Sequence, residues 1–104
     1  MSFTFFSGDL PDMIRSSQLP LVVDFCSRRS TPSRRLFPVM DELSQEFKGR
    51  ASVYIVDIEE RPELAKLYGI RSIPTVLIIR NGEVTSASVG FREMSSYAEL
   101  LERL

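Results

Sequence analysis

The stretch YGIRSIPTVLIIRNG, residues 68–82, decides the fold. Its apolar, β-branched run over residues 76–80 predicts a buried strand. The dipeptide Asn81-Gly82 is typical of a type I′ turn, in which both central residues take a positive φ. Residues 83–89 are therefore expected to return antiparallel to that strand and to complete a β-hairpin.

Upstream of this hairpin, two further apolar runs predict buried strands at residues 21–25 and 53–58. Runs of this kind are typical of parallel strands that are covered on both faces. Between them, apolar residues recur at helical spacing, namely Leu36, Val39, Met40, Leu43 and Phe47, and Gly49 is the expected stop. These segments together predict a right-handed βαβ unit.

The remaining segments complete the element order. Residues 3–6 predict an edge strand, residues 9–17 a first helix and residues 62–68 a short third helix. An apolar stripe near the C-terminus predicts a last helix, capped near Ser95 or Ser96. The stripe consists of Tyr97, Leu100, Leu101 and Leu104. The expected order is βαβαβαββα.

Length and composition narrow the class of protein. A chain of 104 residues forms one domain, residues 1–104, with a self-sufficient core. Its net charge of −1 gives no global attraction to nucleic acid or to an anionic membrane. The absence of histidine excludes a cysteine–histidine zinc site and a Ser-His-Asp triad, and we expect neither a metal nor a cofactor. Residues 1–10 lack a signal-peptide pattern, and no apolar run is long enough for a transmembrane helix, so we expect a cytoplasmic monomer.

Several short motifs fall, without a gap, at the spacing of one protein family. They are Val22-Val23-Asp24-Phe25, Pro38, Tyr68-Gly69-Ile70-Arg71-Ser72-Ile73-Pro74-Thr75, Asn81-Gly82 and Gly90. In these motifs the chain resembles the thioredoxin family, whose members are thiol–disulfide oxidoreductases. The resemblance implies the thioredoxin fold, a three-layer α/β/α sandwich around a mixed sheet of four to five strands.

The resemblance also implies a groove for a client protein. It implies that Pro74 is in the cis form and that the backbone at Ile73 pairs with an extended segment of the client, beside Thr75 and Gly90. From the residues alone, a trans turn proline is the default, since the cis form costs roughly 0.5–1 kcal/mol before proline. The groove would also include Arg29, Thr31 and Pro32.

The two redox-cysteine positions of the family fall on Ser30 and Ser33. A serine hydroxyl is hardly ionised near neutral pH, and oxygen cannot leave as sulfur does in disulfide exchange, so no dithiol chemistry is expected there. Ser30 is expected to cap a helix, with Pro32 in the first turn. Arg28, Arg29, Arg34 and Arg35 flank this helix start, and they indicate either a site for an acidic or phosphate-bearing ligand or simply a solvated surface.

Asp24 lies within an apolar strand, where burial should raise the pKa of its carboxyl. By resemblance it is the buried acid that serves the second cysteine, whose position is now Ser33. Either the cysteines were replaced while this acid remained, or Asp24 hydrogen-bonds Ser33 or water. The lysine that often accompanies this acid is replaced by Ile55.

Cys26 is the one cysteine of the chain, which excludes an intramolecular disulfide. At the end of an apolar strand it is expected to be a buried, inert side chain. Alternatively, Arg28 and Arg29 lower the pKa of its thiol and make it a lone reactive thiol.

Three functions remain open. The first is a redox-inactive module that binds an extended peptide by strand addition. The second is a protein-disulfide reductase in which Cys→Ser changes at positions 30 and 33 have removed the thiols. The third is a redox sensor or monothiol reagent that uses Cys26.

Overall fold

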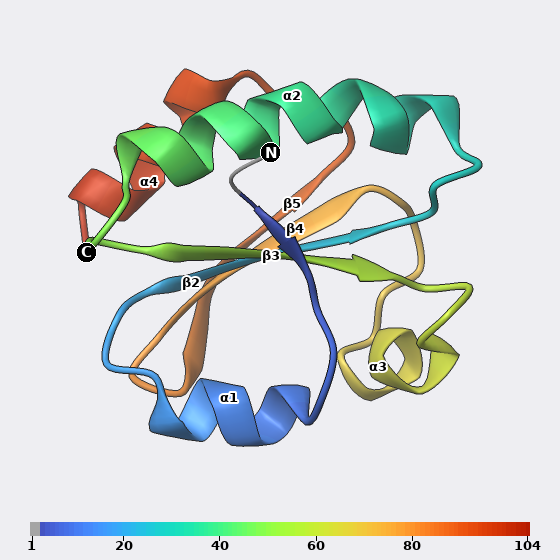
Figure 1. Ribbon diagram of the computed structural model, residues 1–104, viewed down its shortest axis with the longest axis horizontal. Coiled ribbons are helices and arrows are strands. Elements are labelled where there is room, and N and C mark those ends of the chain that lie inside the picture. Colours follow the sequence, from blue (N-terminus) through green and yellow to red (C-terminus); the bar gives the residue numbers. More distant parts are fainter. Residues whose placement is uncertain (1–2) are drawn as a thin grey trace.

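The computed structural model describes residues 3–104, and its elements follow the expected order (Figure 1). The helices are α1 (Leu10–Ser16), α2 (Thr31–Glu46), α3 (Pro62–Leu67) and α4 (Met94–Glu102). The strands are β1 (Thr4–Phe5), β2 (Leu21–Cys26), β3 (Ser52–Asp57), β4 (Thr75–Arg80) and β5 (Glu83–Val89).

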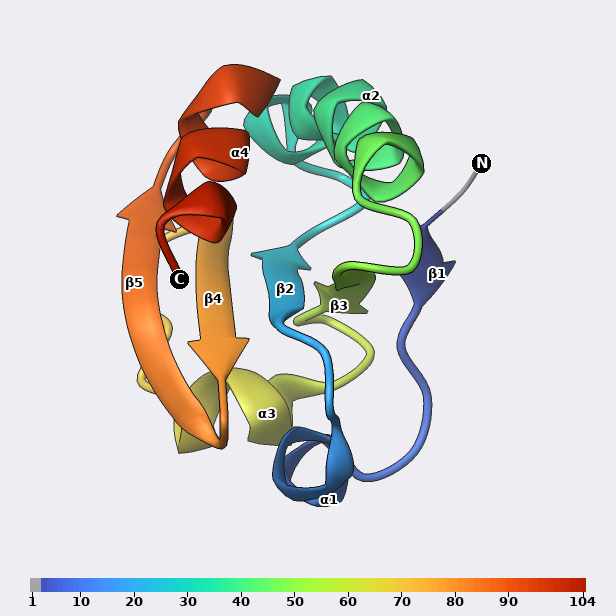
Figure 2. The ribbon, with the colours of Figure 1, turned by 90° about the vertical axis from the view of Figure 1, so that its left-hand side faces the viewer.

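The strands form one mixed sheet in the order β1-β3-β2-β4-β5. The first three of these are parallel, and β4 and β5 each run antiparallel to the preceding neighbour. Figure 2 shows α2 and α4 at one face of the sheet and α1 and α3 at the other. The expected three-layer α/β/α sandwich is therefore confirmed, with five strands.

Strand β2 divides the core because its side chains alternate between the two faces. Val22 and Cys26 pack against the α2–α4 face, whereas Val23 and Phe25 pack against the α1–α3 face. All four are fully buried. Asp24 shares the face of Val22 and Cys26, so its carboxylate points into the apolar layer under α2 and α4.

The β4–β5 hairpin forms where the sequence predicts it. Asn81 and Gly82 have φ values of 51° and 80°, the positive values that a type I′ turn requires. The ladder of backbone pairs runs from Arg80 and Glu83 back to Thr75 and Val89.

The start of α4 differs from the expected cap at Ser95 or Ser96. The helix begins at Met94 after Glu93, and no side chain caps it. Met94, the first residue of the helix, packs against the core cluster on the α2–α4 face of the sheet, and no serine hydroxyl caps the first turn.

The sheet register brings four chain segments to one end of the molecule. Phe25 of β2 pairs with Thr75, and Thr75 pairs in turn with Val89. On the other side of β2, Cys26 pairs with Asp57. The loops that follow β2, β3 and β5 and the loop that precedes β4 therefore lie next to one another, and most of the predicted site residues belong to them.

Candidate functional site

The loop after β2 turns directly into α2. Ser30 is the N-cap, as expected, and its hydroxyl accepts a hydrogen bond from the Ser33 N–H at 3.4 Å. Pro32 lies in the first turn, where a missing N–H costs nothing. Ser33 is fully buried, and its hydroxyl accepts a hydrogen bond from the Ser27 N–H at 3.2 Å. Both serine oxygens are thus held by backbone donors.

The loop before β4 contains the backbone edge of the predicted groove. The Ile73–Pro74 peptide bond is cis. The Pro74 carbonyl accepts a hydrogen bond from the Gly90 N–H at 2.8 Å, and the Thr75 hydroxyl donates to the Ser72 carbonyl at 2.6 Å. Within residues 3–104, neither the N–H nor the C=O of Ile73 has a hydrogen-bond partner. This loop therefore leaves one donor and one acceptor free at its edge.

Most of the predicted groove residues lie at this same end of the sheet. Thr31 and Pro32 are exposed at the start of α2, and Thr75 and Gly90 lie one strand and two strands away from β2. Val89 and Phe91, which the sequence did not single out, are exposed on either side of Gly90. Chain proximity to Gly90 was the signal that could have found them.

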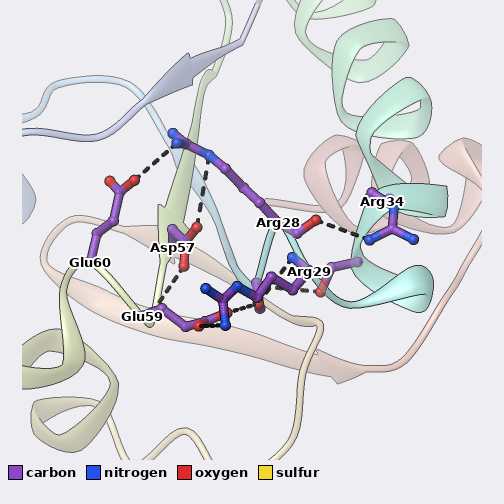
Figure 3. A network of polar contacts seen from close by, with 8 residues as sticks. Arg28, Arg29, Arg34, Asp57, Glu59 and Glu60 are labelled. Atoms are coloured by element: carbon purple, nitrogen blue, oxygen red, sulfur yellow. Dashed lines mark hydrogen bonds and ion pairs between the residues drawn. The ribbon is translucent and has the colours of Figure 1, made fainter.

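The four arginines do not form a common anion site. Arg28 makes ion pairs with Asp57 at 3.7 Å and with Glu60 at 2.9 Å, and its guanidinium lies 3.9 Å from the centre of the Phe5 ring. Arg29 pairs with Glu59 at 3.7 Å (Figure 3). These contacts direct two of the four guanidinium groups to the end of β3 instead of to the start of α2.

The other two arginines stay with α2. Arg34 donates to the Arg28 carbonyl and to the Thr31 hydroxyl, each at 3.1 Å. Arg35 lies with its guanidinium 5.0 Å from the centre of the Phe91 ring. Neither has a carboxylate partner among the residues that the structure describes, so their charge remains available at the surface.

The acidic residues after β3 were not recognised in the sequence. Asp57, Glu59 and Glu60 hold the loop after β2, both through the arginines and through a hydrogen bond from the Ser27 hydroxyl to the Glu59 carboxylate. A signal was present, because the carboxyl ends of adjacent parallel strands meet at one edge of a sheet. Basic residues after one strand and acidic residues after its neighbour are therefore brought together.

Asp24 is the least satisfied group of the site. Its side chain is fully buried, and neither carboxylate oxygen has a hydrogen-bond partner among residues 3–104. A hydrogen bond to Ser33, one of the alternatives left open by the sequence, is absent, and the Ser33 hydroxyl only accepts a hydrogen bond from the Ser27 N–H. Ile55 and Val76 are its apolar neighbours in the sheet. Burial in these surroundings raises the pKa of Asp24 to about 7.

Tyr97 adds a second unsatisfied polar group to the same layer. Its hydroxyl is buried without a partner in the described part of the chain. Burial, and next the charge of Asp24, raise the pKa of this hydroxyl. The sequence predicted Tyr97 only as a member of the apolar stripe, since the periodicity of a helix says nothing about the hydroxyl.

Cys26 is a core side chain. It is fully buried, and burial raises the pKa of its thiol well above the ordinary value, with Asp24 and Asp57 adding to the effect. Arg28 lowers this pKa only to a lesser extent. The alternative of a reactive thiol activated by neighbouring arginines is therefore wrong for the folded protein.

Residues 3–104 contain neither a metal-binding cluster nor a membrane-spanning helix. No cluster of three or more cysteine, aspartate or glutamate side chains is arranged to hold a metal ion. None of the four helices combines the length and the apolar composition needed to cross a bilayer.

The three-layer sandwich, its strand order and the loops gathered at one end of the sheet define a class of α/β proteins. Comparison with known proteins identifies the family. The family model Thioredoxin matches residues 6–103. Thioredoxin of Rickettsia felis is 36% identical over 90 residues, or 86% of each chain. Thioredoxin of a Synechocystis species is 38% identical over 90 residues, or 86% of this chain and 84% of that protein. The chloroplastic M-type thioredoxin of Pisum sativum is 36% identical over 92 residues, or 88% of this chain and 54% of that protein. The chain belongs to the thioredoxin family.

Proposed function

We propose that this protein is a redox-inactive member of the thioredoxin family that binds an extended segment of a client protein. The free N–H and C=O of Ile73 carry the proposal, because they offer the donor and acceptor that an added strand requires. Exposed apolar side chains lie beside this edge, with Val89 at 59% and Phe91 at 41% exposure. They provide contact area for the side chains of such a segment.

The loss of redox activity follows from the positions of the serines. In the register of the family, Ser30 and Ser33 stand at the two redox-cysteine positions. Their oxygens accept hydrogen bonds from the backbone, a role that serine fills and that needs no ionisation. The one thiol of the chain, Cys26, is fully buried. We therefore expect the protein to show no insulin reduction above the uncatalysed rate, and turnover would contradict the proposal.

The surface charge at the start of α2 indicates the chemical character of the client segment. Arg34 and Arg35 have no carboxylate partner among residues 3–104, so their charges are available at the start of α2. Arg28, by contrast, is paired with Asp57 and Glu60. We propose that client segments carry an acidic or phosphate-bearing side chain next to the paired segment. Binding should then weaken as salt is raised, because exposed charges are screened.

Peptide binding can be tested with carboxymethylated insulin B chain, which contains no free thiol. Saturable shifts of the Ile73 amide signal in a nuclear magnetic resonance titration are expected. Val89→Glu places a charge beside the edge and should weaken binding severalfold. Val84→Glu is the matched control, because Val84 is 51% exposed on the same strand but near the hairpin turn.

An equal loss of peptide affinity in the two valine variants, or no saturable shift at Ile73, would contradict the proposal that a peptide binds in the groove. A binding failure would leave the redox prediction standing, since the insulin reduction assay does not depend on the groove variants.

One observation supports a second function. Asp24 is a buried acid with no partner and a pKa of about 7, which suits a site built to exchange protons with a thiol. This favours a protein-disulfide reductase whose cysteines at positions 30 and 33 have been changed to serine. Cysteine codons at these positions in the unmodified gene would establish this alternative and exclude the first.

A further inference from the structure

A polar hollow lies between β5 and α4, outside the groove described above. Its volume is about 310 Å³. Ser86 and Ser88 of β5 and Ser96 of α4 contribute to its lining, together with Arg92 from the connection between these elements. In Figure 2, α4 lies over the β4–β5 side of the sheet.

The serines of β5 occupy positions where a core side chain is expected. Ser86 pairs with Ile78 and Ser88 pairs with Val76 across the hairpin, and both partners belong to the buried core under α2 and α4. Apolar residues at positions 86 and 88 would continue that core to the edge of the sheet. Serine leaves space there and lines it with hydroxyl groups.

At least one of these hydroxyls lacks a partner among the described residues. Ser88 is only 6% exposed and lines the hollow, although its oxygen is not among the fully buried unpartnered atoms of residues 3–104. The Ser86 oxygen, by contrast, is buried and is unpartnered in the described part of the chain. A buried hydroxyl without a partner costs free energy, so the Ser86 hydroxyl favours a ligand that enters the hollow and accepts a hydrogen bond from it.

The charges of the hollow specify the sign of that ligand. Arg92 forms no ion pair or hydrogen bond with any residue that the structure describes. The one carboxylate of the lining, Glu99, is held by Arg103 at 2.7 Å. The hollow therefore offers three hydroxyl donors and one free guanidinium, with its single acidic side chain already neutralised.

We propose that this hollow binds a tetrahedral oxyanion, either inorganic phosphate or the phosphoryl group of a larger ligand. The Arg92 guanidinium supplies the charge-assisted hydrogen bonds, and Ser86, Ser88 and Ser96 donate to the remaining oxygens. The proposal is independent of peptide binding, because it uses no residue of the groove.

The test is an amide chemical-shift titration of the folded protein with sodium phosphate and, separately, with phosphoserine, at constant ionic strength set by sodium chloride. Saturable shifts at residues 86, 88, 92 and 96 are expected. Arg92→Gln should raise the dissociation constant at least about tenfold, and Ser88→Ala should raise it severalfold. Tighter binding of phosphoserine than of phosphate would indicate a phosphorylated ligand, whereas equal or weaker binding would indicate the free ion.

Arg15→Gln is the matched control, because Arg15 is an exposed arginine of α1 on the opposite face of the sheet. It should leave both dissociation constants unchanged. Shifts that do not saturate, or that Arg92→Gln and Arg15→Gln reduce equally, would mean an adventitious ion only and would overturn the proposal.

Discussion

Replacing Asp24 with asparagine should remove most of the pH dependence of folding stability between about pH 5 and about pH 9. The carboxyl has a pKa of about 7 in the folded protein, against an ordinary value of 3.8. Between these values the folded state holds a proton that the unfolded state has released. Stability therefore falls as the pH rises through this window, and it levels off above about pH 7.

The size of the effect follows from the shift. A pKa difference of about 3 units corresponds to about 4 kcal/mol of destabilisation once Asp24 is ionised in both states. About 3 kcal/mol of this destabilisation develops between about pH 5 and about pH 9. The chain has no histidine, and its one thiol, whose pKa burial raises in the folded state, contributes only near the upper end of this window, where the unfolded thiol begins to ionise.

The measurement is urea unfolding, followed by far-ultraviolet circular dichroism, of the wild type and Asp24→Asn at both pH values. The stability of the variant relative to the wild type should grow by about 3 kcal/mol from the lower to the higher pH. Asp12→Asn removes an exposed carboxylate and serves as the control, with no such change expected. A relative stability of Asp24→Asn that is the same at both pH values would refute the raised pKa.

Three further outcomes are expected. Iodoacetamide at neutral pH should label Cys26 in urea but not in the folded protein, and rapid labelling of the native state would contradict its burial. Ser30→Ala should lower the free energy of unfolding by about 1 kcal/mol through loss of the N-cap, while Ser95→Ala, which removes no cap, should change it by less. Cysteine at both Ser30 and Ser33 should restore at most weak insulin reduction, because Arg29 leaves the site differently supported. Activity equal to that of an ordinary thioredoxin would speak against a natural loss of function.

Much of the fold could be predicted because its signals are local. Asn81-Gly82 encodes its own turn, and Ser30 with Pro32 encodes the start of α2. The start of α4 could not be predicted in this way. Ser95 and Ser96 both suit a cap, but the helix begins at Met94, which packs against a core cluster formed by residues distant in sequence.

The site was harder to predict because its interactions join separate segments. The position of Asp24 in an apolar strand predicted its burial, but the hydrogen bond from the Ser27 N–H to the Ser33 hydroxyl depends on the path of the loop. The basic character of Arg28 was visible, whereas its pairing with Glu60 required the alignment of two parallel strands. Residue type thus predicted which groups matter, and the sheet determined which of them meet.

The ion pairs of Arg28 and Arg29 join the loop after β2 to the acidic residues at the end of β3 and in the loop after it (Figure 3). Pairs at the surface weaken when salt screens them, whereas backbone hydrogen bonds between strands do not. Ionic strength should therefore affect the mobility of the loops after β2 and β3. In concentrated salt, amide hydrogen exchange should accelerate in these two loops and stay unchanged in the β4–β5 hairpin.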